Sequence, residues 1–137
     1  MAGCRLILVP VDFSETSGLA LEAAVAWARA FGAHIDVLHV VPLNGVGTVE
    51  AEAALPRAAP AVLDDVVQSR RVVKALAPEL AIIEAARKAP IDLIVMGTHG
   101  RSGWSHVKLG SVAERVVQLA PCSVLTVRRP GQTFVRP

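Results

Sequence analysis

The stretch Leu6-Ile7-Leu8-Val9-Pro10-Val11 decides the fold of this chain. Side chains of a strand alternate between its two faces, and here both alternating sets are apolar. A strand needs that composition when helices cover both faces of its sheet, as they do in parallel α/β proteins. We therefore expect residues 6–11 to form a central strand of a parallel sheet.

The segments after this strand alternate between helical and strand patterns. Residues 15–31 are predicted to form a helix that Ser14 caps and Gly32 ends. Residues 43–69 are interrupted by glycines and prolines, and within them we expect a helix at 61–68 and an extra turn at 50–55. Apolar spacing predicts the other elements, which are strands at 34–41, 71–76, 91–96 and 122–127, and helices at 78–88 and 111–119.

Five strands alternating with helices predict an open α/β parallel sheet with helices on both faces, a Rossmann-like arrangement. With residues 6–11 at the centre, the strand order is 3-2-1-4-5. A length of 137 residues is near the commonest domain size, so we expect one domain over residues 1–137. Ligands of such sheets bind beyond the carboxyl ends of strands 1 and 4, where Asp12 and Gly97 follow their strands.

A glycine-rich segment follows the fourth predicted strand. It reads Gly97-Thr98-His99-Gly100, then nine residues, then Gly110-Ser111. Backbone amides of residues 97–103 can form a nest for an anion, and the helix that begins at Ser111 adds partial positive charge. Arg101 and Lys108 add formal positive charge. The pattern therefore predicts a cradle for two or three phosphates; the alternative is a flexible connection that uses glycine only for turns.

Asp12 and the histidines each allow two interpretations. The Asp12 carboxylate could accept hydrogen bonds from a ribose or hold a metal ion beside phosphates, or it could simply cap a helix. His99 is a turn residue or a ligand contact. His39 alternates with apolar residues and is interpreted as a packed core histidine rather than a metal ligand. Cys, His, Asp and Glu show no metal-ligand spacing, so no structural zinc is expected.

Composition excludes several classes of protein. Hydrophobic residues make up 53% of the chain without an apolar run of about 18, so neither disorder nor a membrane span is expected. A net charge of +2 and 4% aromatic residues argue against a nucleic-acid partner. The amino terminus lacks the regions of a signal peptide, which favours a cytoplasmic location. Cys4 and Cys122 are expected to stay unpaired, because the cytosol disfavours disulfides and another strand separates theirs.

Other nucleotide and hydrolase motifs are missing from the sequence. It contains neither a Walker lysine loop nor the dinucleotide glycine pattern after the first strand. A nucleophile elbow is also missing. The glycine-rich segment carries no carboxylate to hold Mg²⁺ or to position water for ATP hydrolysis. The sequence therefore favours nucleotide binding over rapid turnover.

Four segments together resemble the universal stress protein family, and the resemblance spans nearly the whole chain. They are Leu8-Val9-Pro10-Val11-Asp12-Phe13-Ser14, Leu38-His39-Val40-Val41, residues 92–101, and the pattern Gly97-x-x-Gly100-x9-Gly110-Ser111. In that family the glycine pattern is typical of members that bind ATP. The resemblance thus implies ATP as the ligand, with Mg²⁺ as an accompanying ion that Asp12 could hold.

Position by position, the resemblance implies which residues surround the nucleotide. Asp12 would contact the ribose or phosphates, with Pro10, Val11 and Ser14 around it, and Val40 would meet adenine through its backbone. The remaining contacts would come from Met96, Gly97, Gly100, Arg101, Ser102, Gly103, Gly110, Ser111 and Val112. Similar proteins form homodimers, which implies antiparallel pairing of residues 122–127, an edge that needs covering.

The chain departs from the family pattern on the lid side of the expected cleft. Residues 43–69 are short and proline-rich where relatives commonly carry a longer helix, and Ala77-Pro78 lacks the glycine often found before that proline. The leading hypothesis is an ATP-binding, homodimeric regulator of the stress response. Its rivals are a slow ATPase or phosphotransfer protein that uses Asp12, Ser111 and Lys108, and an interaction module with a vestigial cleft.

Overall fold

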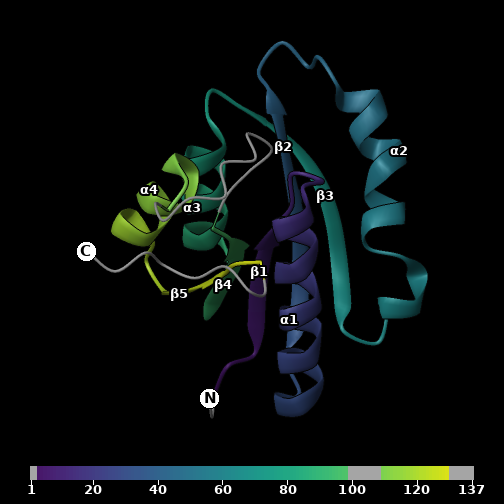
Figure 1. Cartoon of the computed structure of the whole chain (residues 1–137), viewed down its shortest axis with the longest axis vertical. Helices are drawn as coiled ribbons and strands as arrows, with labels where there is room; N and C mark the ends of the chain where they lie inside the picture. Colours follow the sequence, from purple (N-terminus) through teal and green to yellow (C-terminus); the bar gives the residue numbers. More distant parts are fainter. Residues whose placement is uncertain (1–2, 99–108, 130–137) are drawn as a thin grey trace.

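The computed structural model describes residues 3–98 and 109–129. Its sheet has five parallel strands in the order β3-β2-β1-β4-β5 (Figure 1), which confirms the predicted order. The strands are β1 (Leu6–Pro10), β2 (His34–Pro42), β3 (Val67–Ala75), β4 (Leu93–Gly97) and β5 (Ser123–Val127).

The centre of the sheet is β1, as its two-sided apolar pattern predicts. It pairs with β2 on one side and with β4 on the other. Ile7 and Val9 belong to one buried cluster and Leu8 to a second, and all three are fully buried. The alternation of β1 therefore divides its side chains between two cores, one on each face of the sheet.

Two helices cover each face (Figure 1). α1 (Glu15–Phe31) and α2 (Thr48–Ala58) pack on the first face, and α3 (Pro78–Lys88) and α4 (Ser111–Leu119) on the second. Small residues such as Ala20 and Ala24 let α1 lie close to the sheet, and both are fully buried. Ser14 caps α1 by accepting a hydrogen bond from the Ser17 amide at 3.2 Å, and Gly32 ends it in the left-handed conformation.

Within residues 43–69 the predicted helix at 61–68 is wrong, whereas the predicted extra turn at 50–55 lies inside α2. The helix lies at 48–58 rather than 61–68, a short 3₁₀ turn occupies Ala61–Leu63, and β3 already begins at Val67. Pro56 argued against the earlier helix, but α2 ends two residues later, so the loss is confined to the one hydrogen bond that the amide of residue 56 would donate. Val66 and Val67 are both buried; the Ile35 amide of β2 donates to the Val66 carbonyl, and Val67 pairs with Ile35 as the first residue of β3.

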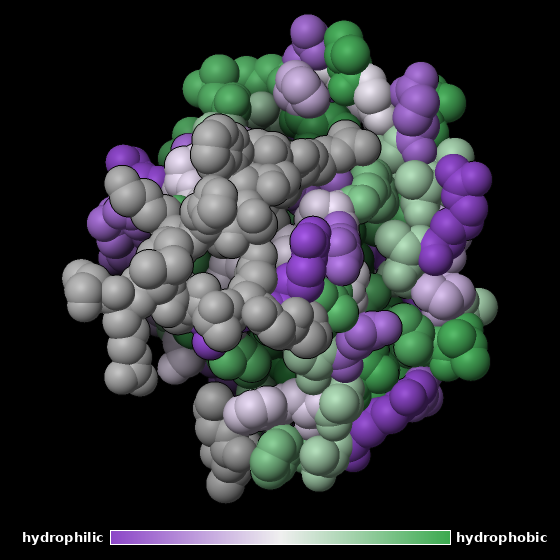
Figure 2. Space-filling view, viewed as in Figure 1, coloured by the Kyte–Doolittle hydropathy of each residue, from purple (hydrophilic) through white to green (hydrophobic). Residues whose placement is uncertain are grey.

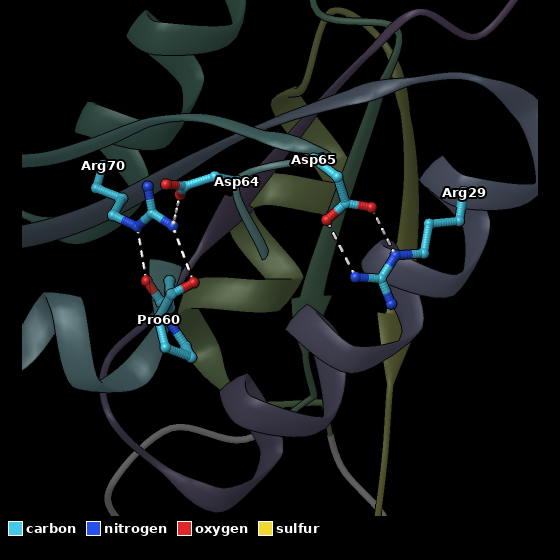
Figure 3. Close-up of polar contacts among 6 residues, drawn as sticks. Arg29, Pro60, Asp64, Asp65 and Arg70 are labelled. Atoms are coloured by element: carbon cyan, nitrogen blue, oxygen red, sulfur yellow. Dashed lines mark hydrogen bonds and ion pairs between the residues drawn. The ribbon is translucent and has the colours of Figure 1, made fainter. Parts of the chain in front are cut away.

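Polar contacts hold the segment between α2 and β3 in place (Figure 3). The Arg70 guanidinium donates to the Ala59 carbonyl at 2.6 Å, to the Pro60 carbonyl at 3.1 Å and to Asp64 at 2.7 Å. Asp65 forms a two-bonded pair with Arg29 of α1, at 2.9 and 3.1 Å. These contacts join the start of β3 to both helices of the first face.

Aliphatic side chains are exposed where β2 and β3 end. Leu43, Val46 and Leu76 are 56%, 68% and 82% exposed, and they follow the carboxyl ends of these strands. Figure 2 shows hydrophobic side chains gathered at the top of the molecule, the end at which β2 and β3 terminate in Figure 1. These exposed side chains lie at the edge of the sheet formed by the carboxyl ends of the strands.

None of the helices within residues 3–98 and 109–129 is long and apolar enough to cross a membrane.

Candidate functional site

A cavity of about 320 Å³ opens at the carboxyl ends of β1, β2 and β4. This volume lies near the lower limit of small-molecule sites, which are roughly 300–1,000 Å³. Its lining is mainly apolar, with a few polar side chains. The lining residues are Pro10, Val11, Asp12, Ser17, Leu38, His39, Val40, Pro78, Ile82, Met96, Gly97, Thr98, Gly110, Ser111, Val112 and Ala113.

The chain leaves β1 through a tight polar turn. The Val11 amide donates to the Leu38 carbonyl at 2.8 Å, which continues the pairing with β2 beyond Pro10. The Asp12 carboxylate accepts from the Ser14 amide at 3.0 Å, and the Asp12 amide donates to the Ser17 hydroxyl at 3.3 Å. Asp12 is not the helix cap, because Ser14 is the N-cap of α1; Asp12 instead holds the amide of that residue and also lines the cavity.

The end of β4 lies against the start of α1, and Gly97 makes this approach feasible. A Cβ atom at Gly97 would lie 2.7 Å from the Thr16 hydroxyl oxygen and 2.9 Å from the Thr16 backbone carbon. Both distances are well below ordinary van der Waals contact, so a side chain has no room here. Gly97 thus fits because of close packing between two elements of the site rather than because of an unusual φ angle.

The chain returns to the site at Gly110, where α4 begins. The Thr98 amide donates to the Val127 carbonyl at 2.9 Å, and the Gly110 amide donates to the Thr98 carbonyl at 2.6 Å. Gly110 is the N-cap residue of α4 and has no side chain with which to cap it. Ser111, Val112 and Ala113 in the first turn of α4 line the cavity, and a helix N-terminus at a cavity attracts anions.

Most of the predicted site residues line this one cavity, although they come from four separate segments of the chain. They are Pro10, Val11, Asp12, Val40, Met96, Gly97, Gly110, Ser111 and Val112. Ser14 is not a lining residue, because its hydroxyl caps α1 instead. The predictions for Gly100, Arg101, Ser102, Gly103 and His99 lie outside the described residues.

Sequence reasoning missed several lining residues, which are Ser17, Leu38, His39, Pro78, Ile82 and Ala113, whereas Thr98 belongs to the predicted 97–103 nest. His39 is the most informative of them. Its ring is half-buried at the cavity wall rather than packed in the core as predicted, with Nδ1 2.7 Å from the Val11 carbonyl oxygen. Its place near the carboxyl end of β2 was the signal that could have identified it. Among the described residues, no group of three or more His, Cys, Asp or Glu side chains could hold a metal ion.

The opposite edge of the sheet carries the two cysteines, and both are free thiols. Burial raises the pKa of the Cys4 and Cys122 thiols above the ordinary value, and the negative charge of Asp92 raises each further. Asp92 itself accepts hydrogen bonds from the amides of Arg5 and Leu6 at 2.8 and 3.0 Å. These groups stabilise the amino ends of the strands and take no part in the cavity.

The sequence of this chain matches a known protein family over most of its length. The model of the universal stress protein family matches residues 4–128, which is nearly the whole chain. This chain belongs to the universal stress protein family. Its relatives include the universal stress protein MJ0531 of Methanocaldococcus jannaschii, 32% identical over 92% of this chain and 83% of the relative. Another is YxiE of Bacillus subtilis, 31% identical over 89% of this chain and 97% of the relative.

Solved structures of other family members share the fold. MJ0577 of Methanocaldococcus jannaschii superimposes with a TM-score of 0.82 and 28% identity, over 93% of this chain and 98% of MJ0577. A universal stress protein solved in complex with cAMP has a TM-score of 0.72 and 27% identity, over 90% of this chain and 96% of that protein. The family therefore includes a similar member that binds a nucleotide.

Proposed function

We propose that this chain is an ATP-binding universal stress protein with a nucleotide-dependent regulatory role in the stress response. One observation carries the proposal. Asp12 after β1, Gly97 after β4 and Gly110-Ser111 at the start of α4 line one cavity at the carboxyl edge of the sheet. Ligands of open α/β sheets bind at this point, between strands whose helices lie on opposite faces.

The chemistry of the lining suits a nucleotide. Val40, Ile82 and Met96 offer apolar surface for a base, and the Asp12 carboxylate can accept hydrogen bonds from ribose hydroxyls. The uncapped N-terminus of α4 and the Ser111 hydroxyl suit phosphate oxygens. The similar structure solved with cAMP supports an adenine nucleotide as the ligand class.

Binding rather than hydrolysis is the proposed activity. Asp12 is the acidic side chain among the lining residues, and its Oδ1 already accepts from the Ser14 amide. Rapid hydrolysis of ATP needs a positioned water and firmly held Mg²⁺. Asp12 could assist one Mg²⁺ ion carried by ATP, but the described lining offers no second carboxylate for a firm site.

The exposed edge of the sheet supports a homodimer. β5 pairs with β4 on one side, and no strand within residues 3–98 and 109–129 pairs with its other side. Unpaired strand edges are commonly covered by pairing with another chain. We infer that two copies pair along β5, and that the dimer acts in the cytoplasm. Light scattering coupled to size-exclusion chromatography tests the dimer, and a monomer at micromolar concentration would contradict it.

Calorimetric titration with ATP tests the proposed ligand, together with mass analysis of nucleotide released from freshly purified protein. We expect saturable binding, and a loss of affinity of at least about tenfold in Gly110→Leu, whose side chain would obstruct the start of α4. Gly18→Leu is the matched control, because Gly18 is exposed in α1 with nothing within 4 Å of its added Cβ.

Wild-type protein that does not bind ATP at millimolar concentration would contradict the ligand. Equal affinity in Gly110→Leu and wild type would contradict the location. ATP turnover that Asp12→Ala abolishes would show that the protein is an enzyme rather than a binding protein alone.

A further inference from the structure

His39 makes a directional hydrogen bond to the turn that follows β1. Its Nδ1 lies 2.7 Å from the Val11 carbonyl oxygen. A carbonyl oxygen can only accept, so Nδ1 must carry the proton and donate. This fixes the tautomer of the neutral ring, with the proton on Nδ1 and a lone pair on Nε2.

Phe13 lies on the other side of the same turn and has a strained backbone. Its φ angle is 64°, and it is the non-glycine residue with positive φ among those described. Bulky residues rarely adopt this left-handed conformation, which costs about 1–3 kcal/mol and persists only where neighbouring contacts maintain it. The ring of Phe13 stacks on His39, with 4.3 Å between centroids and an interplanar angle of 28°.

Asp12 lies between these two contacts. The hydrogen bond of His39 holds the residue before it, Val11, and the stacking contact holds the residue after it, Phe13. Val11, Asp12 and His39 all line the cavity. Among the described residues, the polar contact of His39 and its aromatic contact are therefore both made with the turn that carries the acid.

We propose that His39 is a positioning residue for nucleotide binding. It holds the strained Val11–Phe13 turn in the conformation that presents the Asp12 carboxylate to the ligand. This inference rests on the proposed function. It assigns His39 a role beyond packing, because a packing residue would contribute to stability without changing the affinity of the folded protein for ATP.

Two substitutions at position 39 separate the hydrogen bond from the ring. His39→Phe keeps an aromatic ring against Phe13 but removes the donor and leaves the Val11 carbonyl unpaired. We expect the Kd for ATP to rise about tenfold. His39→Asn places a side-chain N–H near the position of Nδ1, so it should recover most of the lost affinity. His34→Phe is the matched control, because His34 is exposed at the opposite end of β2.

Calorimetry on the full chain provides the affinities, and thermal unfolding shows that each variant is folded. Unchanged affinity in His39→Phe, or no recovery in His39→Asn, would overturn the inference while the proposed function stands. Wild-type protein without ATP affinity would overturn the proposed function and this inference with it.

A measurement on the unmodified protein keeps the test independent of whether the variants fold. Nitrogen-15 NMR of the imidazole distinguishes its tautomers, and we expect His39 to carry its proton on Nδ1. A neutral ring protonated on Nε2 would exclude the hydrogen bond to Val11 and overturn the inference.

Discussion

Replacing Gly97 with alanine tests the packing on which the site depends. The added Cβ would lie 2.9 Å from the backbone carbon of Thr16, whereas ordinary contact begins near 3.4 Å. Thr16 can rotate its hydroxyl away, but its backbone carbon moves only if the start of α1 withdraws. The required shift is about 0.5 Å, the difference between these two distances.

The cost follows from that shift. Forcing one extra carbon into a packed region typically costs about 1–3 kcal/mol. Alanine lowers the conformational entropy of the unfolded chain relative to glycine, and this stabilises the folded protein by about 0.4–1 kcal/mol. We therefore expect Gly97→Ala to lower the free energy of unfolding by about 1–2 kcal/mol, which for a chain of this size lowers the Tm by about 3–8 °C.

Circular dichroism during urea and thermal unfolding measures both quantities. Gly18→Ala is the control, because the same change in the exposed first turns of α1 meets nothing within 4 Å. Alanine favours helix over glycine, so this variant should gain about 0.5–1 kcal/mol. Opposite signs for the two variants support the reasoning. If Gly97→Ala is as stable as wild type, the close approach of β4 to α1 is not a real constraint.

Three further predictions concern the cap, the ion pair and the thiols. Ser14→Ala removes the side-chain cap of α1 and should cost about 1 kcal/mol of unfolding free energy, measured by urea denaturation; no loss would argue against the cap. The hydrogen bonds from Arg29 lower the pKa of Asp65 below its ordinary value, so this pair stabilises the fold fully above the pKa of the unfolded chain. That contribution is lost as the pH falls through the lower folded-state value, so the difference in stability between wild type and Asp65→Asn should shrink in acid and in high salt. Because burial raises the pKa of both thiols, alkylation of the folded protein at pH 7 should be slow. Mass spectrometry of the alkylated protein should show half-buried Cys122 reacting before buried Cys4. Rapid labelling of Cys4 would contradict its burial.

The sequence predicted the architecture because the strongest local signals lie in the centre of the sheet. Residues 6–11 are apolar at every position, and their burial between two helical layers leaves few alternatives. Ser14 and Gly32 set the ends of α1 through contacts within a few residues, so local chemistry sufficed there. The resemblance of the glycine pattern then indicated the family, which the match over residues 4–128 shows.

Local reasoning was wrong for residues 61–68, where the decisive contacts are remote. Val66 and Val67 are predicted as part of a helix, but Val66 ends a turn and Val67 begins β3, because β2 offers backbone pairing at Ile35. Arg70 then holds the preceding turn through carbonyl groups 10 and 11 residues away in the sequence. No periodicity within the segment encodes these partners.

The sequence by itself determined the alternation of strands and helices, the two-sided core around β1 and the family, because each depends on residue types at short, regular spacing. Only the tertiary structure decided that Asp12, His39, Gly97 and Gly110 surround one cavity, since they lie on segments far apart in the chain. It also decided that Phe13 adopts a left-handed backbone conformation, with its ring stacked on that of His39. Such a conformation is unfavourable locally and is maintained only by contacts that the completed fold supplies.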